Sequence, residues 1–190
     1  MSVAKYGLPS TVLFCKRCVI SNQRPSSCIE YEHRIESPKR TIRFLDGVCE
    51  ACLMAEAKKS IDWSVREQEL QALCEKYRGH GKYDCIVPGS GGKDSFYAAH
   101  VLRTEYRMRP LLVTWAPHLY TDVGWRNLQR WQAVGDHILL TPCTRVHRIL
   151  TRLALDNLFH PFQPFILGQK VLAPRLAHEY SIPLVFYGES

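Results

Sequence analysis

Hydrophobic and polar positions change their pattern along the chain near residue 60. Before this point the hydrophobic periodicity is poor and turn formers recur, as in Pro25-Ser26-Ser27 and Asp46-Gly47. After it, stretches with a helical period alternate with short apolar runs. A segment of about 60 residues without a periodic pattern usually needs a metal ion or disulfides to hold its shape. The pattern therefore predicts a small module over residues 1–59 and a regular domain over residues 60–190.

The regular domain is predicted to alternate strands with helices. Its first helix begins at a capping box formed by Ser64 and Glu67 and ends near Gly79. The predicted strands cover residues 84–87, 111–115, 137–140 and 182–187. The further predicted helices cover residues 94–107, 122–134, 144–158 and 165–180. This order predicts an α/β fold in which a parallel sheet, built from right-handed crossovers, carries helices on both faces. Ligands of such sheets bind at the carboxyl ends of the strands.

The last predicted strand is followed directly by Gly188-Glu189-Ser190. In a parallel α/β domain an active-site loop begins at such a position, and a closing helix covers the last strand. We therefore expect that the sequence is cut in mid-domain. The uncovered strand would be an open edge, so self-association of the chain is also expected.

Composition narrows the class of protein without identifying it. The chain has 190 residues, of which 46% are hydrophobic and 23% charged, and these values exclude a disordered or collagen-like protein. No apolar run approaches 18 residues, and the N-terminus lacks the apolar core of a signal peptide. We expect a cytoplasmic protein that does not interact with membranes.

The net charge of +7 is concentrated toward the N-terminus, since residues 1–60 contain ten basic and six acidic residues. A basic surplus suits an anionic partner such as a nucleotide, a sugar nucleotide or RNA. It does not choose among these partners, and a solvated basic surface that keeps the protein soluble explains it equally well.

Two C-x-x-C pairs, Cys15/Cys18 and Cys49/Cys52, have the layout of a zinc ribbon or zinc knuckle. Two thiolates three positions apart in a tight turn reach one ion, and two such turns complete a tetrahedron. Four thiolates leave no open coordination position, so a structural Zn²⁺ is expected, although an iron–sulfur cluster uses the same ligands. The spacing therefore predicts a zinc-ribbon-like module with these four metal ligands.

The other four cysteines have no pair spacing. Cys28 lies between the two pairs and could compete as a ligand. Cys74 falls on the apolar face of a predicted helix and Cys85 within a predicted strand, so both are expected in the core. Cys143 follows the third predicted strand, where a nucleophile is conceivable, but no neighbouring base in the sequence supports that role.

A glycine-rich loop, Ser90-Gly91-Gly92-Lys93-Asp94-Ser95, connects the first predicted strand to the next helix. Glycines at this junction let consecutive N–H groups point at an anion, and the helix N-terminus adds its positive dipole. The loop lacks the Ser or Thr that follows Lys in a Walker A loop, and it does not contain the G-x-G-x-x-G pattern of dinucleotide-binding folds. A phosphate-binding loop of another class is therefore predicted.

The string S-G-G-K-D-S at 90–95 resembles the PP-loop of the N-type ATP pyrophosphatases, whose pattern is S-G-G-x-D-S. The resemblance implies that ATP and Mg²⁺ bind here and that the bond between the α- and β-phosphates is cleaved. It implies hydroxyl donors from Ser90 and Ser95 and backbone amides from Gly91 and Gly92. Asp94 would hold Mg²⁺ or orient an amide, and Asp94 and Ser95 would be the catalytic residues. Lys93 occupies the variable position and would contribute to nucleotide binding.

Several further motifs together resemble the N-acetyl sugar amidotransferase family of lipopolysaccharide and surface-sugar biosynthesis. They are C-K-R-C-V at 15–19, G-V-C-E-A-C at 47–52, Y-D-C-I-V-P-G-S-G-G-K-D-S at 83–95, L-L-V-T-W-A-P-H at 111–118, T-D-V-G-W-R-N at 121–127, F-I-L-G-Q-K at 165–170 and I-P-L-V-F-Y-G-E at 182–189. The resemblance covers nearly the whole chain. Members of the family continue beyond the last motif for about as many residues again, and the stretch between the two cysteine pairs is longer here.

The family resemblance implies an activity and partners. The acetamide oxygen of a nucleotide-activated N-acetyl sugar would be adenylated by ATP, with release of pyrophosphate. Ammonia would then displace AMP and leave an acetamidino group. No Cys-His glutaminase signature occurs in the sequence, so the ammonia would come from a separate glutaminase with a cyclase-like channel subunit.

The same resemblance implies further nucleotide-binding residues. The strand at 111–115 would place Thr114 and Trp115 beside the adenine through backbone contacts. Lys170 matches a basic position used against the phosphates, and Gly188 with Glu189 begins the loop that closes over the nucleotide. Candidates on the substrate side follow the second strand: Asp122, Trp125 and Arg126.

Two other functions remain open at this point. Enzymes that thiolate tRNA belong to the same superfamily and also carry C-x-x-C pairs and a basic surface. They typically have a further C-x-x-C after the third strand, where this chain has only Cys143, so nucleic acid is not the expected partner. Alternatively, the chain is a truncated, inactive remnant that binds ATP and zinc without turnover.

Overall fold

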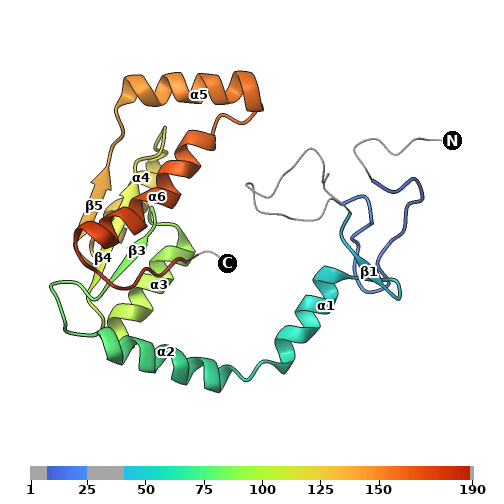
Figure 1. The fold of residues 1–190 in the computed structure, drawn as a ribbon, viewed down its shortest axis with the longest axis horizontal. Helices are drawn as coiled ribbons and strands as arrows, with labels where there is room; N and C mark the ends of the chain where they lie inside the picture. Colours follow the sequence, from blue (N-terminus) through green and yellow to red (C-terminus); the bar gives the residue numbers. More distant parts are fainter. Residues whose placement is uncertain (1–7, 25–40, 189–190) are drawn as a thin grey trace. The chain divides into compact units, whose positions relative to one another are not determined.

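The computed structural model describes residues 8–24 and 41–188, so Cys28 and Glu189 lie outside the described residues. The chain divides into two compact units, Met1–Ser64 and Val65–Ser190. Each unit is described by itself below, because their placement relative to each other is not determined (Figure 1).

The first unit is built around a short antiparallel hairpin of β1 (Phe44–Leu45) and β2 (Val48–Cys49). Asp46 and Gly47, which connect the strands, have φ angles of 51° and 80°. Two left-handed residues in a two-residue hairpin loop are the mark of a type I′ turn, which an Asp-Gly dipeptide favours. Helix α1 (Glu50–Ala57) follows at once and leads into the 3₁₀ helix η3 (Lys58–Ser60). No residue of α1 is buried, so hydrophobic periodicity does not reveal this helix.

The second unit contains a three-stranded parallel sheet in the order β3-β4-β5. Its strands are β3 (Cys85–Pro88), β4 (Pro110–Trp115) and β5 (His137–Leu140). Its helices are α2 (Trp63–Tyr77), α3 (Lys93–Thr104), α4 (Asp122–Gln132), α5 (Thr144–Leu158) and α6 (Gln163–Glu179). The alternation of strands and helices confirms the predicted α/β class, and the register pairs Ile86 with Leu111 and Val113 with Ile138.

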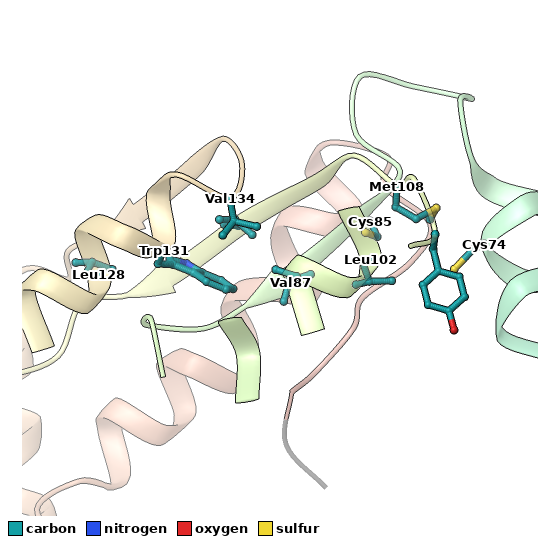
Figure 2. Close-up of a cluster of buried hydrophobic side chains, with 11 residues drawn as sticks. Cys74, Cys85, Val87, Leu102, Met108, Leu128, Trp131 and Val134 are labelled. Atoms are coloured by element: carbon teal, nitrogen blue, oxygen red, sulfur yellow. The ribbon is translucent and has the colours of Figure 1, made fainter. Parts of the chain in front are cut away.

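Helices cover both faces of the sheet, as predicted. On one face, side chains from α2, α3 and α4 pack with alternate strand residues, and Figure 2 shows part of this cluster. Its buried members are Cys74, Cys85, Val87, Ala99, Leu102, Tyr106, Met108, Leu112, Leu128, Trp131 and Val134. On the other face, α6 contributes its apolar stripe, and this cluster comprises Ile86, Leu111, Val113, Leu172, Ala173, Leu176 and Ile182. Cys74 and Cys85 are fully buried, which confirms their assignment to the core.

The fourth predicted strand, 182–187, is not a strand of the structure. The segment makes a single parallel bridge, between Val185 and Ile86. Two hydrogen bonds support it, from Ile86 N to Leu184 O (2.8 Å) and from Phe186 N to Ile86 O (2.9 Å). Pro88 of β3 lacks an N–H, so the next hydrogen bond of this parallel ladder, from residue 88 to the Phe186 carbonyl, cannot form.

This short pairing nevertheless fixes the topology. The crossovers from β3 to β4 and from β4 to β5 place α3 and α4 on one face, whereas the return through α6 to the far side of β3 covers the other face. The direction of strand addition therefore reverses at β3. In open α/β sheets this reversal is the topological switch point, where a crevice forms at the carboxyl ends of the strands.

The first helix of the second unit begins at Trp63, two residues earlier than a capping box with Ser64 as N-cap predicts. Asp62 caps it, because its carboxylate accepts hydrogen bonds from the Ser64 N–H (2.9 Å) and the Ser64 hydroxyl (2.6 Å). The other predicted partner, Glu67, accepts a hydrogen bond from the Tyr106 hydroxyl instead. An Asp two residues before Ser64 competes for the cap position, since both side chains are good N-caps.

Helix α5 lies beyond the carboxyl end of β5 (Figure 1). Several of its apolar side chains face solvent: Val146, Ile149, Leu150, Leu153 and Leu158. Among residues 8–24 and 41–188, no helix combines the length and hydropathy that a membrane span requires.

Candidate functional site

The first cysteine pair lies in a tight turn. The Cys15 N–H donates to the Ile20 carbonyl (2.9 Å), and a bridge between Phe14 and Ser21 closes the turn behind it. Within this turn the Arg17 N–H donates to Cys15 Sγ (3.3 Å). The turn therefore directs both thiols of the pair to one side, as the C-x-x-C spacing predicts.

The second pair lies at a helix N-terminus, not in a second turn between strands as a zinc ribbon would have it. Cys49 ends β2 and occupies the N-cap position of α1, and Cys52 lies in the first turn of that helix. The spacing of three residues places the two thiols on the same side of the helix.

The four sulfur atoms of Cys15, Cys18, Cys49 and Cys52 all lie within 4.8 Å of one another. Cys15 Sγ is 3.9 Å from Cys52 Sγ, and Cys18 Sγ is 3.6 Å from Cys49 Sγ. Disulfide sulfurs lie about 2.0 Å apart, so these are free thiols. Four sulfurs held at about 2.3 Å from one ion in a tetrahedron are separated by about 3.8 Å. The predicted ligand set is thus brought together with the spacing of a tetrahedral metal site, which is compatible with zinc.

The protonation of these thiols shows why a cation suits the site. The Cys49 N–H donates to Cys15 Sγ (3.3 Å), and with further donors it lowers the pKa of the Cys15 thiol to about 6. Contacts with the Cys18 and Cys49 sulfurs, together with burial, raise the pKa of Cys52 to about 12. The Cys15 thiolate is therefore stabilised by the protein itself, whereas deprotonation of Cys18 and Cys52, whose pKa values are raised, needs a positive charge at the centre.

Among the described residues of the first unit, cysteines supply two of the three side chains of the buried apolar cluster. Its buried cluster consists of Cys15, Ile42 and Cys49, packed against the partly buried Cys18, Ile20, Phe44, Val48 and Cys52. A cluster of this size stabilises little by hydrophobic burial alone. A bound metal would therefore act as the core of this unit, in a structural role.

The glycine loop of the second unit begins at the carboxyl end of β3, at the topological switch point. The Gly89 N–H donates to the Val113 carbonyl (3.0 Å) and the Thr114 hydroxyl donates to the Gly89 carbonyl, so the start of the loop is anchored to β4. Within the described ranges, the N–H groups of Ser90, Gly91 and Gly92 have no hydrogen-bond partner. Gly92 is the N-cap of α3 and provides no side-chain cap. Consecutive unpaired N–H groups at a helix N-terminus form a binding site for an anion such as phosphate.

At two positions of this site another backbone segment lies so close that only glycine, which has no Cβ, fits. Gly91 has a φ of +86°, and a Cβ there would lie 2.6 Å from the Asn127 carbonyl carbon of α4. A Cβ on Gly188 would lie 2.6 Å from Ser95 N and 2.7 Å from Ser95 Cα. The end of the described chain therefore passes directly over the N-terminus of α3, which brings Gly188 to the glycine loop although the two are far apart in sequence.

The two predicted catalytic residues lie in the first turn of α3. The Asp94 carboxylate forms an exposed ion pair with Lys93 (Nζ–Oδ1 2.6 Å). The Ser95 hydroxyl donates to the Gly92 carbonyl (3.2 Å), next to the three unpaired N–H groups. Both side chains are near the loop, and the Lys93–Asp94 pair must open if Asp94 is to bind a metal ion.

A groove of about 550 Å³ lies beside the loop, between α3 and α4. Lys93, His100 and Arg130 line it together with the rings of Phe96 and Tyr97, and no acidic residue contributes to the lining. Basic side chains next to aromatic rings favour an anionic ligand that carries a flat or apolar group.

At the carboxyl end of β4, Thr114 is only 1% exposed, and its side chain is engaged within the sheet. Trp115 is half-buried and packs on Gly168 of α6, where a Cβ would collide with the indole. His147 and His118 continue this cluster, with ring centroids 6.3 Å from Trp115 to His147 and 4.7 Å from His118 to His147. The indole is thus held by packing, with its nitrogen buried and unpaired.

The remaining predicted residues occupy the surface. Lys170 is exposed on α6, and Cys143 is exposed just before α5. Asp122 is the first residue of α4, and the Trp125 ring stacks edge-on with Tyr120 at 5.2 Å. Arg126 is an exposed residue of the same helix. Asp122 and Cys143 lie at the ends of the loops that follow β4 and β5, at the carboxyl end of the sheet, whereas Lys170 lies in the middle of α6.

Two residues that contact the glycine-loop site could not be recognised from the sequence. His137 hydrogen-bonds the Thr114 hydroxyl (2.8 Å), and Asn127 supplies the backbone against which Gly91 packs. Both contacts join residues on different strands or helices. Only knowledge of the strand order could have indicated them.

Neither a protein-family model nor a curated protein matches the chain.

Proposed function

We propose that the chain is an ATP-dependent amidotransferase of the PP-loop type, acting on the N-acetyl group of a nucleotide-activated sugar. The observation that carries the proposal is the glycine loop: three consecutive unpaired N–H groups among the described residues at a strand-to-helix junction, placed at the topological switch point. The S-G-G-K-D-S string on this loop assigns it to ATP pyrophosphatase chemistry rather than to γ-phosphate transfer.

The residues around the loop suit this chemistry. N–H donors from Ser90, Gly91 and Gly92 would stabilise the charge that develops on the leaving pyrophosphate. Asp94 would hold Mg²⁺, which would supply positive charge to neutralise the phosphates, once Lys93 has turned away from the Asp94 carboxylate. The amide oxygen of the sugar attacks the α-phosphate and pyrophosphate leaves, after which ammonia attacks the amide carbon and AMP leaves. The ammonia would be delivered by a partner glutaminase with a channel subunit.

The four-cysteine centre would bind Zn²⁺ in a structural role. All four ligands come from the protein, so the ion would have no open position for a water or substrate. We expect about one Zn²⁺ per chain by elemental analysis of the purified protein. Native protein without metal, with four freely alkylated thiols, would contradict this assignment.

The test of the enzyme assignment is an exchange assay with labelled pyrophosphate. The chain, ATP and Mg²⁺ are incubated with UDP-N-acetylglucosamine as the probe sugar, and ammonium chloride replaces the glutaminase. Incorporation of label into ATP that depends on the sugar is expected, followed by AMP formation when ammonium is present. Asp94→Asn should abolish both. Asp156→Asn, which removes an exposed carboxylate paired with Arg152 on α5, is the matched control and should retain both.

The outcomes distinguish the alternatives. Release of ADP and orthophosphate would contradict the pyrophosphatase assignment. Exchange that depends on tRNA instead of the sugar, with steep salt dependence, would favour thiolation. ATP binding without exchange, both alone and with added glutaminase and channel subunits, would show that the chain is an inactive remnant.

A further inference from the structure

A chain of hydrogen bonds connects β5 to the start of the glycine loop. Gln132 Nε2 lies 3.3 Å from His137 Nδ1, and His137 Nε2 lies 2.8 Å from Thr114 Oγ1. The Thr114 hydroxyl in turn bonds the Gly89 carbonyl. The chain thus crosses the sheet from its β5 edge through β4 to the carboxyl end of β3.

The direction of every bond in this chain is determined by chemistry. A carbonyl oxygen can only accept a hydrogen bond, so the Thr114 hydroxyl donates its single hydrogen to the Gly89 carbonyl. Toward His137 the hydroxyl must therefore accept, which places a proton on His137 Nε2. The Nδ1 atom is then free to accept from the Gln132 amide, so the imidazole is neutral. Burial lowers the pKa of His137, in agreement with a neutral ring.

The bond to the Gly89 carbonyl also orients the next amide. No cis peptide bond occurs in the described parts of the chain. In a trans peptide the carbonyl of one residue and the N–H of the next point in opposite directions. Because the Gly89 carbonyl points to Thr114, the Ser90 N–H points away from β4. The Gly89 N–H is bound to the Val113 carbonyl (3.0 Å), so neither side of Gly89 can rotate freely.

We propose that Thr114 and His137 are positioning residues that hold the Gly89–Ser90 peptide so that its N–H, and not its carbonyl, faces the bound phosphates. The proposal rests on the proposed function, since it takes the glycine loop as the phosphate site. Without the Thr114 hydroxyl this peptide can turn over, and its carbonyl oxygen would then repel the anion that the N–H attracts. His137 holds the hydroxyl in place and occupies its lone pair.

The experiment compares Thr114→Val, which keeps the shape and removes the hydroxyl, with Thr114→Ser, which keeps the hydroxyl. Binding of inorganic pyrophosphate and of ATP·Mg²⁺ is measured by calorimetry. Loss of one hydrogen bond to a charged group should weaken both ligands about 10-fold or more in the Val variant. The Ser variant should stay within about 3-fold of the native protein. Thr151→Val, at a threonine of α5 that donates to the His147 carbonyl, is the matched control and should leave both affinities unchanged.

A measurement without ligand separates this proposal from the proposed function. The carbonyl ¹³C signal of Gly89 and the amide signal of Ser90 should shift in Thr114→Val and be restored in Thr114→Ser. His137→Phe, which removes the donor to the Thr114 hydroxyl, should shift the Gly89 and Ser90 signals in the same direction as Thr114→Val, but by a smaller amount. This second variant also serves if Thr114→Val fails to fold.

Unchanged Gly89 and Ser90 signals in both Thr114→Val and His137→Phe would overturn the proposal. So would pyrophosphate affinity in Thr114→Val equal to that of the native protein. If the native protein binds neither pyrophosphate nor ATP, the proposed function fails and the positioning role for phosphate fails with it. Shifted Gly89 and Ser90 signals would then show that the hydrogen bonds orient this peptide for another purpose.

Discussion

The two units of this chain achieve order by opposite means. In the second unit, two apolar clusters on the two faces of a parallel sheet bury large side chains such as Trp131 and Leu112 completely. In the described part of the first unit, residues 8–24 and 41–64, the buried cluster is three residues, two of them cysteines whose sulfurs face a common centre. One unit is stabilised by hydrophobic burial, and the other is arranged around a position for a metal ion.

This contrast predicts that the stability of the two units responds differently to a single substitution. Hydrophobic stabilisation is distributed over many contacts, so one substitution removes a part of it. Metal coordination is concentrated in a few bonds, and the free energy of metal binding is then the free energy of folding. The first unit should therefore respond in an all-or-none way to loss of one ligand, whereas the second should respond gradually.

The largest expected effect is the loss of one thiol ligand. Cys49→Ser should abolish stoichiometric metal binding and unfold the first unit, because Cys49 would be a metal ligand and is also the end of β2 and the N-cap of α1. Elemental analysis and the dispersion of amide signals from residues 41–60 measure the loss. The signals of the second unit should persist. Cys143→Ser, at an exposed cysteine outside the cluster, is the control, and a retained metal in Cys49→Ser would refute the contrast.

A smaller effect is expected from the largest buried side chain of the second unit. Trp131 is fully buried and packs near Phe96, with ring centroids 5.9 Å apart. Trp131→Ala should reduce the free energy of unfolding of this unit by about 3–5 kcal/mol, measured by urea denaturation. Trp131→Phe, which leaves a smaller cavity, should cost less. Metal stoichiometry should stay unchanged, and metal loss in Trp131→Ala would show that the two units do not fold independently.

An ion pair in the second unit gives a prediction for pH. The buried Asp84 carboxylate accepts from the Gly79 N–H (2.8 Å) and from the Arg109 N–H (2.8 Å), and its Oδ1 lies 3.1 Å from Arg109 Nη2. Burial raises the pKa of Asp84, but the Arg109 side chain and these backbone donors outweigh it and hold the pKa below its usual value. The stabilisation is therefore complete above the unfolded pKa of about 4 and is lost as pH falls through the folded pKa.

Asp84→Asn should accordingly cost about 1–3 kcal/mol at neutral pH, because charge-assisted hydrogen bonds are replaced by weaker ones. Its unfolding free energy should also lose part of the acid dependence that the native protein shows below about pH 4. Denaturant titrations at pH 7 and pH 3 measure both effects. A variant with unchanged acid dependence would mean that the pair contributes nothing to the pH response.

The smallest effects come from two glycines, one in each unit. Gly79 has a φ of +84° with open space around its Cβ position, and Gly47 has a φ of +80° next to the Lys16 side chain. A left-handed conformation costs an alanine about 1–2 kcal/mol. Gly79→Ala should lower the unfolding free energy of the second unit by about 1 kcal/mol. Gly47→Ala should instead weaken metal affinity about 5- to 10-fold, because folding and binding are one step there.

For these glycines, competition with a chelator measures metal affinity and urea denaturation measures stability. If Gly47→Ala destabilises the second unit, or if Gly79→Ala weakens metal binding, the two units are coupled. Equal metal affinity in Gly47→Ala and the native protein would show that the hairpin turn does not hold Cys49 in place.

Local signals in the sequence determined most of the elements of the second unit. The strand at 137–140 and the helix at 144–158 have the predicted bounds, and the other helices begin or end within three residues of the prediction. The strands β3 and β4 are short apolar runs that are buried over most of their length, and the apolar residues of α4 and α5 recur with a helical period, so both patterns are visible in the order of residues. The C-x-x-C spacing likewise brings the two thiols of each pair together, because thiols three positions apart need only a turn to converge, whereas the meeting of the two pairs is a tertiary contact. Helix α1 is not predicted from the sequence, because none of its residues is fully buried and it shows no hydrophobic period.

Only the tertiary structure decided which residues meet across the fold. The strand order, the single bridge at Val185 and the passage of Gly188 over Ser95 depend on contacts between segments far apart in sequence. The same holds for the hydrogen bonds that join His137 and Thr114 to the glycine loop. Such contacts form when packing brings two surfaces together, and the sequence around one residue of a pair does not indicate which residue it will contact. The glycine loop could therefore be identified from the sequence, but the packing of the sheet determined which side chains form hydrogen bonds with it.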